Sequence, residues 1–266
     1  MSSQQPIGIF DSGVGGLSVL RHVHDLLPGE MLLYVADSAH MPYGSLTHEA
    51  VEDRCHRIIN FFIEQNAKAV VVACNTATAA AIESLRRDFS LPIIGMEPAV
   101  KPAVEASRAG VIGVLATSGT LVSDKFSRLL KRFGSSAEVV FQPGLGLVEQ
   151  VEAGDFDSHK TREMLKEHLQ PLLEHGMDVL VLGCTHYPFL TPVIREIVGS
   201  EITILDAGDA IAVELKRQLD KNCLIASENG VGGLQFFSSG DVDSSRETVS
   251  KLWGSEVEIR ALPELN

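Results

Sequence analysis

In the segment AVVVACNTATAAA, residues 69–81, a short apolar run is followed directly by an alanine-rich stretch that favours a helix. Short, continuous apolar runs are typical of strands in a buried parallel sheet, and alanine is the best helix former. A second segment, VLVLGCTHYP at residues 179–188, again has a cysteine directly after the apolar run. Strand–turn–helix junctions of this kind place side chains at the carboxyl ends of parallel strands, where ligands bind in α/β proteins. The two segments therefore predict an α/β fold with candidate functional residues at Cys74 and Cys184.

The same alternation of short apolar runs and amphipathic stretches continues along the chain and predicts mostly parallel sheets covered by helices. We expect strands at Ile7–Phe10, Met31–Val35, Ala69–Ala73, Val111–Leu115, Val139–Phe141, Val179–Leu182, Ile202–Leu205 and Leu234–Phe237. Helical periodicity predicts helices at Leu17–Leu27, His48–Gln65, Ala77–Phe89, Ser123–Phe133, Ser158–His175, Pro192–Val198 and Ala207–Leu219.

The two halves of the chain resemble each other. The segment IGIFDSG at residues 7–13 is echoed by IGVLATS at residues 112–118, and each half then carries one of the two strand–cysteine segments. This pattern predicts a duplicated α/β unit. We expect two similar α/β domains related by pseudo-two-fold symmetry, with the active site in the cleft between them. Residues 1–97 and 208–266 should form one domain, and residues 98–207 the other.

Composition and charge exclude several classes of protein. A net charge of −13 argues against nucleic acid as a partner, because phosphate binding needs clustered lysine and arginine. No apolar run approaches the roughly 18 residues of a membrane span, and the N-terminus lacks the layout of a secretory signal, so we expect no membrane partner and a cytoplasmic protein. The four cysteines form no Cys-x-x-Cys pair, and we expect no metal site.

The two strand-end cysteines suit proton transfer at carbon. The start of a helix favours thiolate over thiol, and Asn75 or Thr76 is the expected N-cap after the first cysteine. After the second cysteine, the imidazole of His186 can polarise or deprotonate the thiol. Inverting a stereocentre requires a base on one face and an acid on the other, and a thiolate and a thiol can fill these roles. The other two cysteines lack this context and are expected to be structural: Cys55 and Cys223.

Four motifs, in order along the chain, resemble those of the glutamate racemases in the aspartate/glutamate racemase family. They are DSGVGGLS at 11–18, Asp37 followed by PYG at 42–44, ACNTAT at 73–78 and GCTHYP at 183–188. The resemblance implies a cytoplasmic isomerase that interconverts L- and D-glutamate with two thiols and no cofactor. It also implies that the D-glutamate supplies peptidoglycan in cell wall synthesis.

The resemblance assigns roles to individual residues. Cys74 corresponds to the thiol that serves D-glutamate, assisted by Asp11, and Cys184 to the thiol that serves L-glutamate, assisted by His186. These four residues and the family glutamate form the expected catalytic set. The implied substrate-binding residues are Asp11, Ser12, Tyr43, Gly44, Asn75, Thr76, Thr117, Thr120, Thr185 and His186.

The family glutamate corresponds to Glu152, with Glu149, one helical turn away, left open. Family members often carry Cys-Pro about eight residues earlier, where this chain has Gly144-Leu145.

Other interpretations remain open at this stage. An aspartate or hydantoin-type racemase would use the same two thiols. A cysteine hydrolase would use Cys184 with His186 as its base, although two residues on a tight turn is a poor spacing for that pair and leaves Cys74 without a role. A dinucleotide site at residues 13–16 is disfavoured because Ser18 stands where the fingerprint has its third glycine. The oligomeric state is left open, with a homodimer as one candidate.

Overall fold

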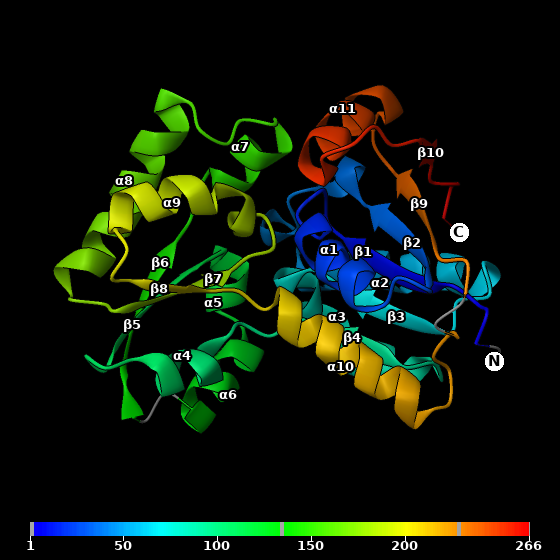
Figure 1. Cartoon of the computed structure of the whole chain (residues 1–266), viewed down its shortest axis with the longest axis horizontal. Helices are drawn as coiled ribbons and strands as arrows, with labels where there is room; N and C mark the ends of the chain where they lie inside the picture. Colours follow the sequence, from blue (N-terminus) through cyan, green and yellow to red (C-terminus); the bar gives the residue numbers. More distant parts are fainter. Residues whose placement is uncertain (1–2, 134–135, 228–229, 266) are drawn as a thin grey trace. The chain divides into compact units, whose positions relative to one another are not determined.

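Two α/β units make up the computed structural model, which describes residues 3–133, 136–227 and 230–265 (Figure 1). One unit is built from two separate parts of the chain, Met1–Met96 and Gly208–Asn266, and we call it the discontinuous unit. The other, Glu97–Ala207, is formed by one uninterrupted segment, and we call it the continuous unit.

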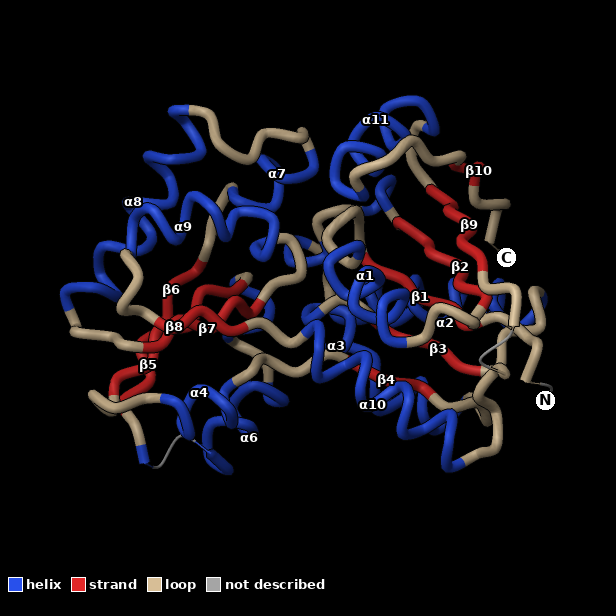
Figure 2. The backbone as a smooth tube through the Cα atoms, in the orientation of Figure 1, coloured by secondary structure: helices blue, strands red, loops and turns tan. Residues whose placement is uncertain are grey.

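The discontinuous unit contains a six-stranded sheet with the order β10-β9-β2-β1-β3-β4 (Figure 2). All of its strand pairs are parallel. Its strands are β1 (Ile7–Asp11), β2 (Met31–Ala36), β3 (Ala69–Val72), β4 (Ile93–Gly95), β9 (Gly233–Ser238) and β10 (Ile259–Ala261). Its α-helices are α1 (Leu17–Leu26), α2 (His48–Glu64), α3 (Asn75–Asp88), α10 (Gly208–Lys221) and α11 (Val242–Trp253). Two 3₁₀ turns, Ser38–His40 and Tyr43–Ser45, follow β2.

Alternating side chains of the strands cover the two faces of this sheet. Phe10 and Val72 belong to the buried cluster that also contains the apolar residues of α2 and α3. Helix α1 packs instead against α10 and α11. Every residue of β1 and β3 is buried, as expected for central strands covered on both faces.

The continuous unit contains a four-stranded parallel sheet with the order β6-β5-β7-β8. Its strands are β5 (Val111–Ala116), β6 (Glu138–Pro143), β7 (Val179–Gly183) and β8 (Thr203–Leu205). Its α-helices are α4 (Val100–Ala106), α5 (Ser118–Leu121), α6 (Asp124–Phe133), α7 (Leu147–Glu152), α8 (His159–Glu174) and α9 (Thr191–Val198), with a 3₁₀ turn at Tyr187–Leu190.

The two units share a strand order. In each, the first strand lies between the second and third, and the fourth lies outside the third: β2-β1-β3-β4 and β6-β5-β7-β8. Both first strands have a glycine at the equivalent position, since Gly8 pairs with Val70 and Gly113 with Leu180, the second residues of β3 and β7. Over each glycine lies a side chain that precedes the third strand: Phe62 from α2 over Gly8, and Met177, just after α8, over Gly113. A Cβ added to Gly8 would lie 2.5 Å from Phe62, and one added to Gly113 would lie 2.4 Å from Met177. This shared packing is what a duplicated α/β unit predicts.

Each strand and helix predicted from the sequence is present, and both sheets are parallel as expected. The structure adds elements that the sequence patterns did not indicate: β4, β10, α4, α5, α7 and α11. Pro192 lies in the first turn of α9, as its position in the sequence suggested. In the described part of the chain, no helix is long and apolar enough to span a membrane.

We predict that Gly8→Ala destabilises the protein more than Gly113→Ala does. The added methyl group of Gly8→Ala meets the rigid ring of Phe62, whereas that of Gly113→Ala meets the flexible end of Met177. Overpacking of this kind costs about 1–3 kcal/mol, and we expect the upper part of that range only for Gly8→Ala. Urea unfolding followed by circular dichroism measures both variants. Equal losses of unfolding free energy would contradict the packing described here.

Candidate active site

Cys74 lies two residues after the end of β3 and is itself the N-cap of α3. The backbone N–H of Ala77 donates to its sulfur at 3.4 Å, and its φ and ψ of −141° and 122° are those of an N-cap residue. The sequence-based expectation that Asn75 or Thr76 caps this helix is therefore wrong by one or two residues. Cysteine is not among the residues preferred at N-caps, so those preferences favoured the neighbouring Asn75 and Thr76. The thiol consequently contacts the positive end of the helix directly.

A chain of hydrogen bonds joins Cys74 to a buried carboxylate. The Cys74 thiol donates to Ser12 Oγ at 3.8 Å, and Ser12 Oγ lies 3.3 Å from Asp11 Oδ1, to which it donates. Asp11 also accepts from the backbone N–H groups of Ser12 and Gly16 at 2.7 and 2.6 Å. Asp11, which the sequence placed beside Cys74, therefore reaches the thiol through the serine hydroxyl.

Asp37 organises the turn that carries Tyr43 and Gly44. Its carboxylate accepts from Tyr43 Oη at 2.5 Å and from both Nε and Nη2 of Arg54, at 3.0 and 2.8 Å. Burial alone would raise the pKa of Asp37, but the hydrogen bonds from Arg54 and Tyr43 hold it below its usual value. Burial and the charge of Asp37 raise the pKa of Tyr43 far above the ordinary tyrosine value. The carboxylate is thus ionised and the phenol protonated, which fixes this turn at the carboxyl end of β2.

Asn75 presents an unpaired polar atom next to Cys74. The side chain is buried, and within the described residues its Oδ1 has no hydrogen-bond partner. A buried amide oxygen without a partner costs about 1–3 kcal/mol, so such atoms are usually satisfied by a ligand or by water. An acceptor in this position suits a ligand N–H donor.

A second chain of contacts lies in the continuous unit, where Cys184 follows β7. Cys184 Sγ lies 3.7 Å from His186 Nδ1, and His186 Nε2 lies 2.7 Å from Glu152 Oε1. The two-residue spacing, which we expected to be poor for a hydrolase dyad, still leaves the thiol and the imidazole in contact. The structure also distinguishes between the two glutamates: Glu152, the last residue of α7, contacts the imidazole.

The environment of His186 favours its protonated form. Burial alone would lower the pKa of His186, but its hydrogen bonds with Cys184 and Glu152 raise it well above the ordinary histidine value. Because the folded state binds this proton more tightly than the unfolded state does, the resulting stabilisation is full below the pKa of an unfolded histidine. It is lost as the pH rises through the pKa of His186 in the folded protein.

The other predicted substrate-binding residues of the continuous unit also lie at strand ends. Thr117 directly follows β5 and caps α5, and its Oγ1 lies 2.9 Å from the hydroxyl oxygen of Thr120. Thr185 follows Cys184 and is buried. In each unit, therefore, the predicted residues gather at the carboxyl edge of its own sheet, as parallel strands require.

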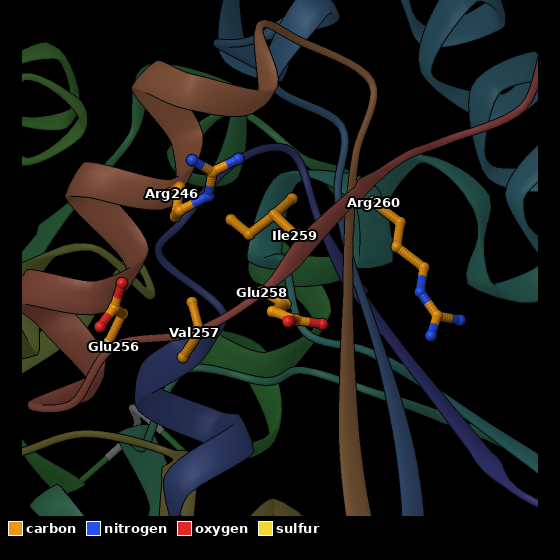
Figure 3. Close-up of a pocket in the computed structure, with 6 residues that line it drawn as sticks. All are labelled: Arg246, Glu256, Val257, Glu258, Ile259 and Arg260. Atoms are coloured by element: carbon orange, nitrogen blue, oxygen red, sulfur yellow. The ribbon is translucent and has the colours of Figure 1, made fainter.

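The remaining cysteines have different surroundings. Cys55 belongs to the buried face of α2, where burial raises the pKa of its thiol, and Cys223 is exposed. Among the described residues, no group of three or more histidine, cysteine and carboxylate side chains could hold a metal ion. A surface depression of about 680 Å³ in the discontinuous unit contains none of the predicted site residues (Figure 3). It is lined by Arg246, Glu256, Val257, Glu258, Ile259 and Arg260.

The sequence patterns missed two residues that hold the site residues in place. Arg54 binds Asp37 from α2, and Tyr187 donates a hydrogen bond to the carbonyl oxygen of Gly144 at 3.1 Å. Arg54 stands in a polar run that also reads as an exposed helix face, and Tyr187 stands inside a motif that was quoted for its neighbours. Neither carried a separate signal.

Comparison with known proteins gives a consistent family. The family model for Asp/Glu/hydantoin racemases matches residues 7–215. A glutamate racemase of Stutzerimonas stutzeri is 50% identical over 259 residues, which cover 97% of both chains. The structure resembles a glutamate racemase of Bacillus anthracis with a TM-score of 0.90, at 31% identity and 98% coverage of each chain. It also resembles an Escherichia coli glutamate racemase in complex with L-glutamate and the activator UDP-MurNAc-ala, with a TM-score of 0.86, 29% identity, and coverage of 97% of this chain and 98% of that one.

We predict that Cys74→Ala and Cys74→Ser differ in stability. Alanine removes the acceptor for the Ala77 N–H and should lower the free energy of unfolding by about 1 kcal/mol, whereas serine keeps a good N-cap. Urea unfolding of the two variants, at matched protein concentration, measures the difference. Equal stability of the alanine and serine variants would show that the sulfur contributes nothing as a cap.

Proposed function

Because this chain belongs to the Asp/Glu/hydantoin racemase family, we propose that it interconverts L- and D-glutamate without a cofactor. One observation carries the proposal beyond the family. Each unit has a buried cysteine within two residues of the end of its third strand in chain order, and one further side chain links each thiol to a carboxylate. The similarity to glutamate racemases favours glutamate over the aspartate and hydantoin alternatives.

The proposed reaction moves one proton at each face of the α-carbon. Starting from L-glutamate, the Cys184 thiolate takes the α-proton and becomes a thiol. The Cys74 thiol then gives its proton to the opposite face of the carbanion and becomes a thiolate. The product is D-glutamate, and the reverse reaction begins with the Cys74 thiolate. This scheme requires both sulfurs to reach the same α-carbon. It gives Cys74 a role, which a hydrolase built on Cys184 would not do.

Asp11 and His186 assist the two thiols in different ways. The hydroxyl of Ser12 connects Asp11 to Cys74, so the carboxylate orients this hydroxyl and through it the thiol. The protonated imidazole of His186 lies against Cys184 and stabilises negative charge on that sulfur, while Glu152 stabilises the imidazolium. Each thiol thus has its own group to adjust its protonation.

Substrate binding uses the polar atoms around the thiols. The unpaired Oδ1 of Asn75 is suited to accept from the α-ammonium group. Hydroxyl groups at the strand ends, such as those of Ser12 and Thr117, and backbone N–H groups at helix starts can bind carboxylate oxygens. An acidic protein can hold an anionic substrate in this way, because a few well-placed donors suffice. We further propose that the enzyme acts in the cytoplasm and that its D-glutamate supplies peptidoglycan synthesis.

We expect the purified protein to exchange the α-proton of L-glutamate with solvent while it racemises the amino acid. Incubation in D₂O without any added cofactor should bring the optical rotation to zero and yield α-deuterated D-glutamate. Polarimetry and ¹H NMR follow the two changes, and L-aspartate and a 5-substituted hydantoin serve as competing substrates. Turnover of either competitor in preference to glutamate, or no loss of rotation at all, would refute the assignment.

Single substitution of either strand-end cysteine should reduce racemisation severely. We expect Cys74→Ser and Cys184→Ser to lower kcat by about 10²- to 10⁴-fold, the range contributed by one general acid or base. Cys223→Ser and Cys55→Ala are matched controls and should keep most of the activity. Circular dichroism verifies that each variant is folded. If Cys74→Ser kept substantial turnover, one thiol would suffice and the two-base scheme would be wrong.

A further inference from the structure

The position of Glu152 depends on a very short helix. Helix α7 has only six residues, Leu147–Glu152, and Glu152 is the last of them. A helix of this length is not stable by itself, so its place must be set by packing and by the segment that leads into it. Its N-cap, Gly146, has a φ of +79° and makes no side-chain capping bond. The segment 144–146, together with the buried side chains of Leu147, Val148, Gln150 and Val151, therefore sets where the Glu152 carboxylate lies.

Tyr187 fixes the start of that segment. It follows His186 directly, is fully buried, and donates from Oη to the Gly144 carbonyl oxygen at 3.1 Å. Two successive residues thus bind the chain on either side of α7. Tyr187 binds Gly144 before the helix, and His186 binds Glu152 at its end. These two side-chain contacts restrict the movement of the helix.

The glycine at position 144 is required for this contact. A Cβ added to Gly144 would lie 2.4 Å from Tyr187 Oη and 2.8 Å from its Cζ. Any side chain at position 144 would therefore push the hydroxyl away from the carbonyl group. Gly144 and Tyr187 fit each other as a pair.

A second contact holds the segment from α8. His168 Nε2 lies 2.9 Å from the Leu145 carbonyl oxygen, while the Leu145 side chain is 66% exposed. Burial of Leu145 therefore contributes little to the position of this segment. Its backbone is held by Tyr187 and His168 at the carbonyl groups and by the Gly144 N–H, which donates to the Ala116 carbonyl oxygen at 3.0 Å.

We infer that Tyr187 is a positioning residue that keeps Glu152 against His186 by holding the Gly144 carbonyl group. Its ring fills the core and its hydroxyl forms the contact, so Tyr187→Phe removes the contact alone. For its kinetic consequence the inference rests on the proposed racemase. Its structural consequence, the position of Glu152 relative to His186, can be measured without substrate.

The first test is the titration of His186 by NMR, using protein labelled at histidine Cε1, with the resonance assigned by loss of the signal in His186→Asn. The titratable groups that face this imidazole are Cys184 and Glu152, with Tyr187 next in the chain. Because the Glu152 hydrogen bond raises the pKa of His186, Glu152→Gln should lower it. We expect Tyr187→Phe to lower it in the same direction by a smaller amount.

Tyr34→Phe is the matched control. In the discontinuous unit, Tyr34 Oη donates to the carbonyl oxygen of Gly13 at 2.8 Å, so this variant also removes a hydrogen bond from a tyrosine to a glycine carbonyl group. It should leave the His186 titration unchanged. Gly144→Ala is a second variant. Its methyl group would displace the Tyr187 hydroxyl from the carbonyl oxygen at position 144, so it should act like Tyr187→Phe. If Glu152→Gln lowers the His186 pKa while Tyr187→Phe and Gly144→Ala do not, the inference is overturned.

The second test is kinetic. We expect Tyr187→Phe to lower kcat for L-glutamate about tenfold with little change in KM, because misplacing a catalytic contact by ~1 Å costs up to about 100-fold. An unchanged kcat, or a loss of kcat that Glu152→Gln does not share, would overturn the inference. A protein that racemises no glutamate in any form would refute the proposed function, and the His186 titration would still decide the role of Tyr187.

Discussion

Parallel pairing between the first and third strands of each sheet is the constraint on which the rest of the structure depends. In the discontinuous unit Phe10 pairs with Val72, so the chain leaves both strands at the same edge and brings Asp11 and Ser12 beside Cys74. In the continuous unit Ala116 pairs with Gly183, which brings Thr117 to the edge that carries Cys184. A shift of one residue in either register would turn these side chains to the other face of the sheet. The hydrogen bond between Cys74 and Ser12, which joins the ends of β1 and β3, can form only in the register observed.

The same scaffold gives the two thiols unlike partners. Cys74 meets a serine hydroxyl, which can share a hydrogen bond but cannot hold a positive charge near neutral pH. Cys184 meets an imidazole that Glu152 helps to keep protonated. Similar folds therefore do not make the two proton transfers equivalent. The reaction proposed here has equal free energies for its substrate and product, yet the groups that perform its two halves differ in charge.

The sequence was sufficient to predict the elements that carry long apolar runs and the polar residues that follow them, because strand ends in a parallel sheet determine where such residues gather. It could not separate Glu149 from Glu152, which lie one turn apart on a helix too short to show periodicity. It also assigned the cap of α3 to amide and hydroxyl groups, whereas the backbone geometry selects the sulfur of Cys74. The link through Ser12 and the contacts made by Arg54 and Tyr187 depend on tertiary packing, and no spacing in the sequence encodes them.

The interrupted course of the discontinuous unit has a consequence for synthesis on the ribosome. Glu97–Ala207 is translated as one uninterrupted segment, so all four of its strands are available as soon as it has emerged. The other unit must wait, because α10, β9 and the edge strand β10 are translated last. Until then the apolar side of α1 that packs against α10 is exposed to water in the nascent chain. The unit whose translation begins first is therefore completed last, and it exposes unpaired apolar surface for longer during synthesis.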